Sequence, residues 1–485
     1  MENIAEHFLH RFFYPASIAL IGASENVFRP SYHLVSNLLK LGYAGPIYPV
    51  HPKQKEILGI KAYPDVGRIE AVPDLAVIAV SQAQTPGLLD DCIRKGIRRV
   101  VLVAGGFSEI GADGRRLQEE MAGRVRASGV RAIGPNALSP INPHIGLAVS
   151  FHALDRLHSG GLSLIFQSGL YEPRLRWLFH DANLHLNKLI DLGNKMDLNE
   201  VDALSYLVHD PLTRVIGLHL ESIEGDPLRF LDLLAEAASL GKPVVVLKSG
   251  RTAAGAKAAA SHTGALVQGN DRVFDRVLKQ VGAIRAESID EFFDLCRALE
   301  RFDGLALAGN RVVIATMPGG EAVVMTDRVQ QEGLTMARVS AGTLERLRPV
   351  FPPWDMPANP FDLGVTMQFG NPVTVFETLV ASLAEDRGVD AVHLQIPDLL
   401  LGLPRETFGM FFPMPEAGKP LVIWVAGMEP GDHETLAWLE DHRIPVFPSP
   451  EKAIRVLRAL HRLQERSRRL RPETGPPSRQ DDRPS

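Results

Sequence analysis

Three segments of the chain share one pattern: a short apolar run, a turn containing glycine, and then a helical stretch. They begin at Ser17 (SIALIGAS), Leu162 (LSLIFQSG) and Arg311 (RVVIATMPGG), and their spacing of about 150 residues is the size of one typical domain. Between them, β-branched apolar runs alternate with amphipathic helical stretches, which is typical of parallel sheets with helices on both faces. The sequence therefore predicts an α/β protein of three tandem parallel-sheet units.

Loops rich in glycine and charged residues near 150–160 and 301–310 separate these segments. We therefore expect domains over residues 1–150, 160–302 and 308–465. Residues 466–485 are charged and proline-rich, with almost nothing to bury. Such a composition predicts a disordered tail.

Charge and hydropathy narrow the class of protein. The net charge of −5 argues against a general nucleic-acid binder, since such proteins carry a basic surplus. The N-terminus lacks the pattern of a signal peptide, and no apolar run approaches the roughly 18 residues that a membrane helix needs. Cys92 and Cys296 are too far apart in sequence to indicate a disulfide framework or a metal site. We therefore expect a cytoplasmic protein that binds neither membrane nor nucleic acid, and we predict no metal site.

Parallel sheets bind ligands beyond the carboxyl ends of their strands, so the turns after the strands are the candidate sites. In the first unit the candidates lie in five such loops, at Gly22, Ala23, Ser24, Lys53, Ser81, Gly106 and Asn136. Backbone N–H groups of the Gly22 turn could hold a phosphate, and Lys53 could pair with one. A tight turn without ligand and a solvated surface charge remain open as alternatives. The turn lacks GxGxxG, which disfavours a nicotinamide dehydrogenase.

In the second unit, Gln167, Ser168 and Gly169 follow a strand and open a predicted helix. A helix N-terminus offers free N–H donors and a positive dipole end, so it could hold a phosphoryl group. A serine N-cap without ligand is the alternative. Glu221 stands at the carboxyl end of the next predicted strand, VIGLHL, where a surface or purely structural role is also open.

His262 lies between small and polar neighbours, in the run Ser261-His262-Thr263-Gly264. A neutral imidazole is a competent nucleophile near neutral pH. It needs one free ring nitrogen, and a carboxylate on the other nitrogen fixes the tautomer. Glu221 is a candidate for that carboxylate. From these residues alone, an ordinary loop role for His262 stays open.

Beyond these residues, longer stretches resemble the NDP-forming acyl-CoA synthetases. The resemblance is closest to the alpha subunit of ADP-forming acetyl-CoA synthetase, a relative of the succinyl-CoA synthetase alpha subunit, and covers residues from about 10 to 465. The stretches are KSGRTAAGAKAAASHTGALVQGNDRVFDRVLKQVGAIR, DLGNKMDLNEVDALSYLVHD, GLHLESI, MPGGEAVVMTD, ANPFDLG and IPVFPSPEKAIRVLRAL. It implies a Rossmann-like CoA-binding domain followed by two flavodoxin-like (succinyl-CoA synthetase-like) domains.

The resemblance also implies roles for the candidate residues. His262 would carry the phosphoryl group with Glu221 as its partner, and Gln167, Ser168, Gly169, Ser261, Thr263 and Gly264 would hold the phosphate. The first-unit turns would bind CoA. The reaction would convert acyl-CoA, ADP and phosphate reversibly into an organic acid, CoA and ATP. No ATP-grasp domain is apparent, so ATP or ADP and Mg²⁺ are expected on a separate beta-type subunit of a hetero-oligomer.

Several residues depart from the family pattern. Phe166 stands where a serine is usual, Ala137 where a cysteine is usual, and Ser81 alters the loop after its strand. The run from Leu170 to Pro173 replaces small residues. These departures leave two readings: an enzyme with an unusual acyl substrate, or a catalytically drifted sensor of CoA or acyl-CoA on the same scaffold.

Overall fold

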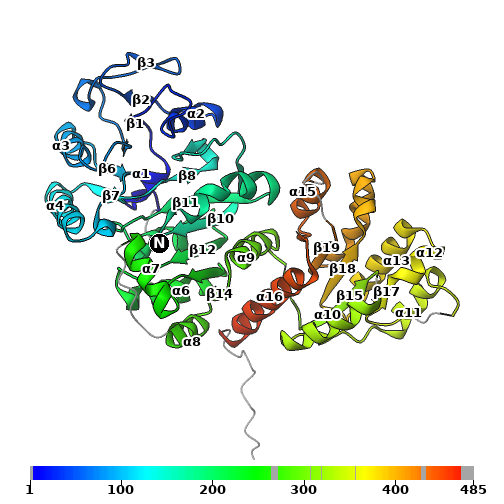
Figure 1. The fold of residues 1–485 in the computed structure, drawn as a ribbon. Coiled ribbons are helices and arrows are strands. Elements are labelled where there is room, and N and C mark those ends of the chain that lie inside the picture. The colour runs from blue at the N-terminus through cyan, green and yellow to red at the C-terminus, as the bar shows by residue number, and fades with distance from the viewer. Residues whose placement is uncertain are drawn as a thin grey trace, which may run out of the picture.

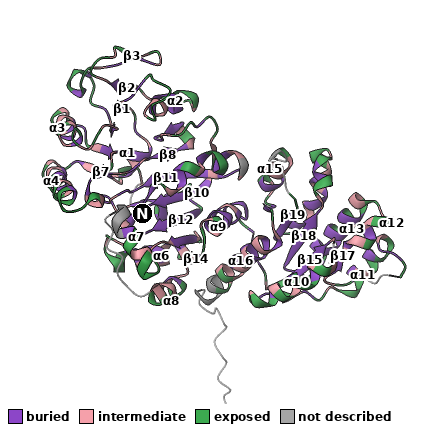
Figure 2. Cartoon of the chain, in the orientation of Figure 1, coloured by how far each residue is buried: buried purple, intermediate pink, exposed green. Residues whose placement is uncertain are grey.

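The computed structural model describes residues 4–263, 271–305, 307–317, 319–354, 357–427 and 433–470. It contains the three predicted α/β units (Figure 1), each built on a largely parallel sheet. The first two units lie directly against each other, and the third stands to one side of them (Figure 1). The sheets are buried while the outer faces of the helices are exposed (Figure 2). The predicted fold class is therefore confirmed.

The first sheet has five parallel strands in the order β2-β1-β5-β6-β7. Its central strands are buried along their whole length, because helices cover both faces. The strands are β1 (Ile18–Ile21), β2 (Ile47–Val50), β5 (Leu75–Ile78), β6 (Arg99–Leu102) and β7 (Arg131–Ile133), and the helices are α2 (Tyr32–Lys40), α3 (Thr85–Lys95) and α4 (Ala112–Ser128). A short hairpin of β3 (Glu56–Ile57) and β4 (Ile60–Lys61) follows β2.

The second sheet has seven strands in the order β14-β13-β12-β10-β11-β8-β9. Five of them are parallel, and a small antiparallel hairpin of β8 and β9 extends the edge at β11. The strands are β8 (Ile141–Asn142), β9 (Leu147–Ala148), β10 (His158–Phe166), β11 (His185–Asp191), β12 (Val215–Leu220), β13 (Val244–Lys248) and β14 (Ile284–Ala286). The helices are α5 (Glu200–His209), α6 (Pro227–Ser239), α7 (Ala253–Thr263), α8 (Asp271–Val281) and α9 (Ile289–Arg301).

The boundary between the first two units differs from the expected position at residue 150. The first sheet ends with β7 at Ile133, and the hairpin of β8 and β9 belongs to the second sheet. The N-terminal helix α1 (His10–Phe13) also reaches the second unit, where Phe13 stacks on Tyr206 with ring centroids 5.2 Å apart. One apolar core contains residues of both units.

The third sheet has the order β16-β15-β18-β19-β20, with β17 paired to the end of β15. The strands are β15 (Arg311–Thr316), β16 (Thr335–Met336), β17 (Phe361–Asp362), β18 (Ala391–Ile396), β19 (Leu421–Val425) and β20 (Val446–Phe447). The helices are α10 (Gly319–Gln331), α11 (Ala341–Leu347), α12 (Leu363–Phe369), α13 (Pro372–Glu385), α14 (Pro413–Glu416), α15 (His433–Asp441) and α16 (Pro450–Leu470). Helix α16 passes residue 466, where the tail was expected to begin, and residues 471–485 lie outside the described part.

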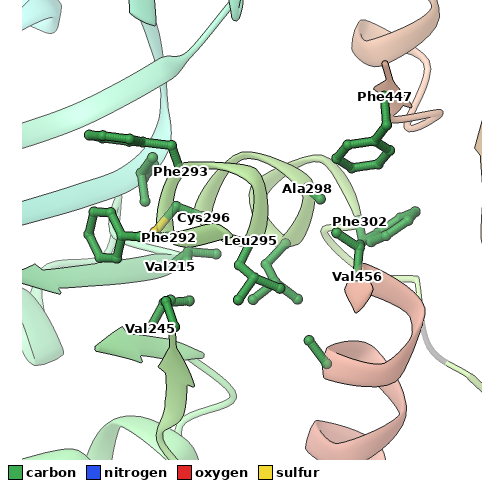
Figure 3. Close-up of a cluster of buried hydrophobic side chains, with 14 of the residues drawn as sticks. Val215, Val245, Phe292, Phe293, Leu295, Cys296, Ala298, Phe302, Phe447 and Val456 are labelled. Atoms are coloured by element: carbon green, nitrogen blue, oxygen red, sulfur yellow. The ribbon is translucent and has the colours of Figure 1, made fainter. Parts of the chain in front are cut away.

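Helix α9 joins the second and third units through apolar contacts on both of its sides (Figure 3). Phe292 and Cys296 lie toward the second sheet, while Phe302 lies toward Phe447 of β20 and Val456 of α16 (Figure 3). These side chains belong to a single buried cluster. The third unit is therefore held to the second by a continuous core as well as by the chain connection.

Candidate active site

The candidate residues of the first unit gather at one edge of its sheet. Gly22 follows β1, Ser81 follows β5, Gly106 follows β6 and Asn136 follows β7, while Lys53 comes after β2. The strand order reverses between β1 and β5, and such a reversal is where open parallel sheets bind ligands. The structure therefore brings all five loops to the edge at which a ligand is expected.

Gly22 is required by the close packing of its turn. It has φ of 93°, and a Cβ at this position would lie 2.4 Å from the carbonyl oxygen of Ala79. Its N–H donates to the carbonyl of Val50 at 3.0 Å, so this N–H is not free for a phosphate. Ala23 is buried, and the Ser24 hydroxyl oxygen accepts a hydrogen bond from the backbone of the same loop at 3.1 Å.

The neighbouring loops are also held by internal hydrogen bonds. The N–H of Gly106 donates to Glu109 Oε1 at 2.6 Å, and the Ser81 hydroxyl donates to Gln84 at 3.0 Å. Asn136 has φ of 62° and donates its N–H to a carbonyl of the loop after β6 at 2.9 Å. Lys53 is exposed and forms no ion pair with any residue placed by the structure. Its ammonium group is a cation at this edge that could meet a phosphate.

In the second unit, Gln167 and Glu221 stand on either side of the point where the strand order reverses, between β10 and β12. Gln167 Oε1 accepts from the N–H groups of Glu221 at 2.8 Å and Ser222 at 2.9 Å. Its Nε2 donates to the Ser222 hydroxyl at 3.0 Å. The Gln167 side chain is 2% exposed, and its oxygen and one of its two amide N–H groups are used within the protein. Its use as a phosphate ligand stays a prediction.

The segment after Gln167 differs from the predicted α-helix. It forms a six-residue 3-10 helix, Gly169–Arg174, followed by a short π-helix, Trp177–Asp181. Pro173 explains the irregularity, because proline lacks the N–H that a regular turn requires and its ring crowds the preceding turn. The Ser168 side chain makes no capping hydrogen bond. The regular helix N-terminus expected to hold a phosphoryl group is therefore replaced by a shorter, tighter turn.

Glu221 is the first residue after β12, and it is 5% exposed. Lys248, the last residue of the neighbouring strand β13, donates from Nζ to the carbonyl oxygen of Glu221 at 2.6 Å. Burial lowers the pKa of Lys248 to about 8. Glu221 thus has a fixed backbone at the edge from which α7 departs after β13.

His262 lies in the last turn of α7 rather than in a loop. The side chains of Ser261, His262 and Thr263 lie outside the described part, as does Gly264 altogether. Helix α7 lies against the 3-10 helix Ser108–Ile110 of the first unit. The pairing of His262 with Glu221 stays a prediction. Glu221 follows β12, and the helix that carries His262 follows the neighbouring strand β13.

Two buried carboxyl groups at the same edge were missed at the level of sequence. Asp191 ends β11 and accepts from the N–H groups of Leu138 at 3.0 Å and Gly193 at 3.1 Å; burial raises its pKa to about 7. Glu172 accepts from the Ser150 hydroxyl at 3.0 Å, and burial raises its pKa to about 8. Asp191 could have been suspected from its place after an apolar run, whereas nothing local marks Glu172 as buried.

A cavity of about 310 Å³ opens between the first two units. One wall is α4, with Arg115 and Arg126, and the other is formed by the strand-end loops of the second unit, including Asn194. Asn194 Nδ2 donates to Glu109 Oε2 across the units at 2.6 Å. Within the described ranges, no three His, Cys, Asp or Glu side chains are grouped so that they could hold a metal ion. Nor does any helix within these ranges have the length and apolarity to cross a membrane.

Comparison with known proteins adds independent findings. Residues 16–142 match the CoA binding domain family, and residues 159–299 match the succinyl-CoA ligase like flavodoxin domain family. The alpha subunit of acetate–CoA ligase [ADP-forming] I from Pyrococcus furiosus is 34% identical over 465 residues, covering 94% of this chain and 97% of that protein. Acetate–CoA ligase [ADP-forming] II from Archaeoglobus fulgidus is 33% identical over 462 residues, covering 94% and 67%.

A solved structure is similar over nearly the whole length. It is the dinucleotide-forming acetyl-coenzyme A synthetase 1 from Ca. Korarchaeum cryptofilum, in complex with phosphate and ADP. The two structures superpose with a TM-score of 0.83 at 30% identity, covering 96% of this chain and 98% of that one.

Proposed function

Because the chain belongs to the ADP-forming acetate–CoA ligase family as an alpha-type acid–CoA ligase, we propose that it is the CoA-binding, phosphohistidine-carrying subunit of an acyl-CoA synthetase. The reaction is the reversible conversion of acyl-CoA, ADP and phosphate into acid, CoA and ATP. The observation that carries the proposal is the placement of Glu221 at the end of β12, beside the strand whose carboxyl end leads into the His262 helix.

The edge of the first sheet suits CoA. Lys53 supplies an exposed ammonium group for a phosphate, and the Gly22 turn lets the chain pass close to the end of β5. Phe28, 92% exposed in the loop after β1, offers an aromatic face on which an adenine could stack. Bound CoA supplies the thiol that accepts or releases the acyl group, and this chain's residues hold and orient it.

The phosphoryl transfer then uses His262 and Glu221. The free ring nitrogen of His262 attacks the phosphorus of an acyl phosphate, forming an N–P bond while the P–O bond to the acyl group breaks and the acid leaves as its carboxylate. Glu221 accepts the hydrogen bond of the other ring nitrogen and stabilises the positive charge that develops on the ring. The phosphoryl group passes from His262 to ADP, which we place with Mg²⁺ on an ATP-grasp beta-type partner, since relatives are named as alpha subunits.

The test is mass spectrometry of the chain after incubation with a beta-type partner, Mg²⁺ and ATP. Acid-labile phosphate is expected on wild type and lost in His262→Ala. His209→Ala is a matched control, because His209 is a surface residue paired with Glu236 at 2.9 Å, and it should keep the phosphate. Glu221→Gln should slow phosphorylation about 10- to 100-fold, the scale for losing an orienting partner. Phosphate on another residue would refute the mechanism.

A sensor function is the second candidate, and the irregular segment Gly169–Asp181 favours it. A 3-10 helix offers a poorer set of free N–H donors than a regular helix start. Saturable binding of CoA by the full chain, with no phosphate on wild type under any condition, would support the sensor. Phosphate on His262 would exclude it.

A further inference from the structure

We propose that Gln167 is a positioning residue that fixes Glu221 for catalysis, an inference that rests on the function proposed above. Each side-chain hydrogen bond described for Gln167 joins it to the loop that begins with Glu221. Its Oε1 takes two consecutive backbone N–H groups, those of Glu221 at 2.8 Å and Ser222 at 2.9 Å. Its Nε2 donates to the Ser222 hydroxyl at 3.0 Å.

The Gln167 side chain makes the hydrogen bonds that the next backbone groups of a strand would make. β10 and β12 are paired up to Ile165 and Leu218, and the loops then leave the sheet. Gln167 continues the cross-strand hydrogen bonding two residues beyond the last paired position, using its amide in place of backbone. Because two N–H groups converge on one oxygen, the direction in which the Glu221 side chain leaves the backbone is constrained.

The far side of the same loop is held by a buried ion pair. Lys195 Nζ donates to the Ser222 carbonyl at 2.8 Å and to Glu200 Oε2 at 2.6 Å. Glu200 Oε1 in turn accepts from the N–H groups of Glu224 and Gly225, each at 2.8 Å. The side chains of both Lys195 and Glu200 are 0% exposed. Charge-assisted bonds of this kind are the stronger class, so the loop after Ser222 forms a rigid support.

The two supports act on different parts of the loop. The ion pair fixes the segment from Ser222 to Gly225, whereas only Gln167 bonds the N–H of Glu221 among the contacts described for that loop. Loss of the ion pair would leave buried charge and is expected to impair folding. Loss of Gln167 leaves the N–H groups of Glu221 and Ser222 without their acceptor, so its effect is expected on the rate.

The experiment measures the single-turnover rate of phosphorylation of His262 together with KM for CoA, in the full chain with its partner. Gln167→Met removes the amide at similar volume. It is expected to lower the rate about 10- to 100-fold and to leave KM for CoA unchanged. Ser222→Ala removes the acceptor of the Nε2 bond, together with the bond that the Ser222 hydroxyl donates to Glu224 Oε1 at 2.8 Å, and is expected to lower the rate less. Gln280→Met, at an exposed position on α8, is the matched control and should change neither quantity.

The decisive measurement repeats Gln167→Met in a Glu221→Gln background. If Gln167 acts through Glu221, the double variant should be no more than about twofold slower than Glu221→Gln alone, because residues that act as a unit are non-additive. Multiplicative losses, or an unchanged rate in Gln167→Met, would overturn the positioning role while leaving the proposed function intact. A Glu221→Gln variant as fast as wild type would instead overturn the role of Glu221 itself, and the positioning role with it.

Should Gln167→Met fail to fold, as judged by thermal unfolding, Ser222→Ala carries the test. A slower rate that vanishes in the Glu221→Gln background supports the positioning role. A slower rate that persists there contradicts it.

Discussion

Replacing Glu172 by glutamine is expected to weaken the pH dependence of the free energy of unfolding. Glu172 is 5% exposed, and burial raises its pKa from 4.5 to about 8. Between these two pH values the folded chain keeps a proton that the unfolded chain has released. The free energy of unfolding therefore falls by about 1.4 kcal/mol for each pH unit. The stabilisation is complete below the unfolded pKa and lost as the pH rises through the folded one.

The total effect is about 4–5 kcal/mol over that range, from one buried carboxyl group. Glutamine keeps the shape and an acceptor for the Ser150 hydroxyl, which lies 3.0 Å from Oε2, but it cannot ionise. Glu172→Gln should therefore be close to wild type at pH 5 and more stable at pH 9. Asp191 has a pKa raised to about 7 by burial and leaves a slope in both proteins. The difference between them reports the ionisation of Glu172 beside Asp191, whose charge adds to the raised pKa of Glu172.

Denaturant unfolding followed by circular dichroism from pH 5 to 9 measures this difference. Glu377→Gln, at an exposed carboxyl group on α13, is the control and should run parallel to wild type. Parallel curves for Glu172→Gln and wild type across this range would show that the carboxyl group is not protonated in the folded chain. A variant less stable than wild type at pH 9 would contradict the sign of the argument.

Three further outcomes are expected. Gly22→Ala should lower the melting temperature and weaken CoA binding in calorimetry, because the new Cβ would lie 2.4 Å from the Ala79 carbonyl oxygen; unchanged binding would remove this turn from the site. Cys92 and Cys296 are buried, with thiol pKa values raised by burial, so a thiol reagent should label them only on unfolding, and fast labelling of the native chain would contradict this. Asn199 Oδ1 caps α5 by accepting hydrogen bonds from two N–H groups. Asn199→Ala should therefore lower the free energy of unfolding by about 0.5–2 kcal/mol; an unchanged melting temperature would argue against the cap.

The positions of the candidate residues followed from the sequence because parallel strands end at one edge. Gly22, Ser81 and Glu221 each come directly after a buried apolar run, and the structure places each at the carboxyl edge of its sheet. The hydrogen bonding of Gln167 to the Glu221 loop could not be predicted from the sequence. Its partner Glu221 is 54 residues away, and only the strand order, with β12 beside β10, brings the two together.

Two features of the fold could not be predicted from the sequence. β8 and β9 have two residues each, too short to show the alternation from which strands are predicted. Their place in the second sheet depends on pairing with β11. The segment after Ser168 is rich in Leu, Arg and aromatic residues, and a proline is acceptable in a first helical turn, so one helix was expected. The effect of Pro173 on the first turns outweighed that preference.

The shared core of the first two units has a consequence for catalysis. Asp191 bonds the N–H of Leu138, and Asn194 bonds Glu109 at 2.6 Å, so the loops after β6 and β7 are tied to the loop after β11. The edge proposed to bind CoA and the edge that carries Glu221 are thus held in one packed body. We therefore expect these two units to keep their relative placement in turnover. On this expectation, movement in turnover falls to the carrier residue His262, whose helix α7 follows β13 and lies against Ser108–Ile110.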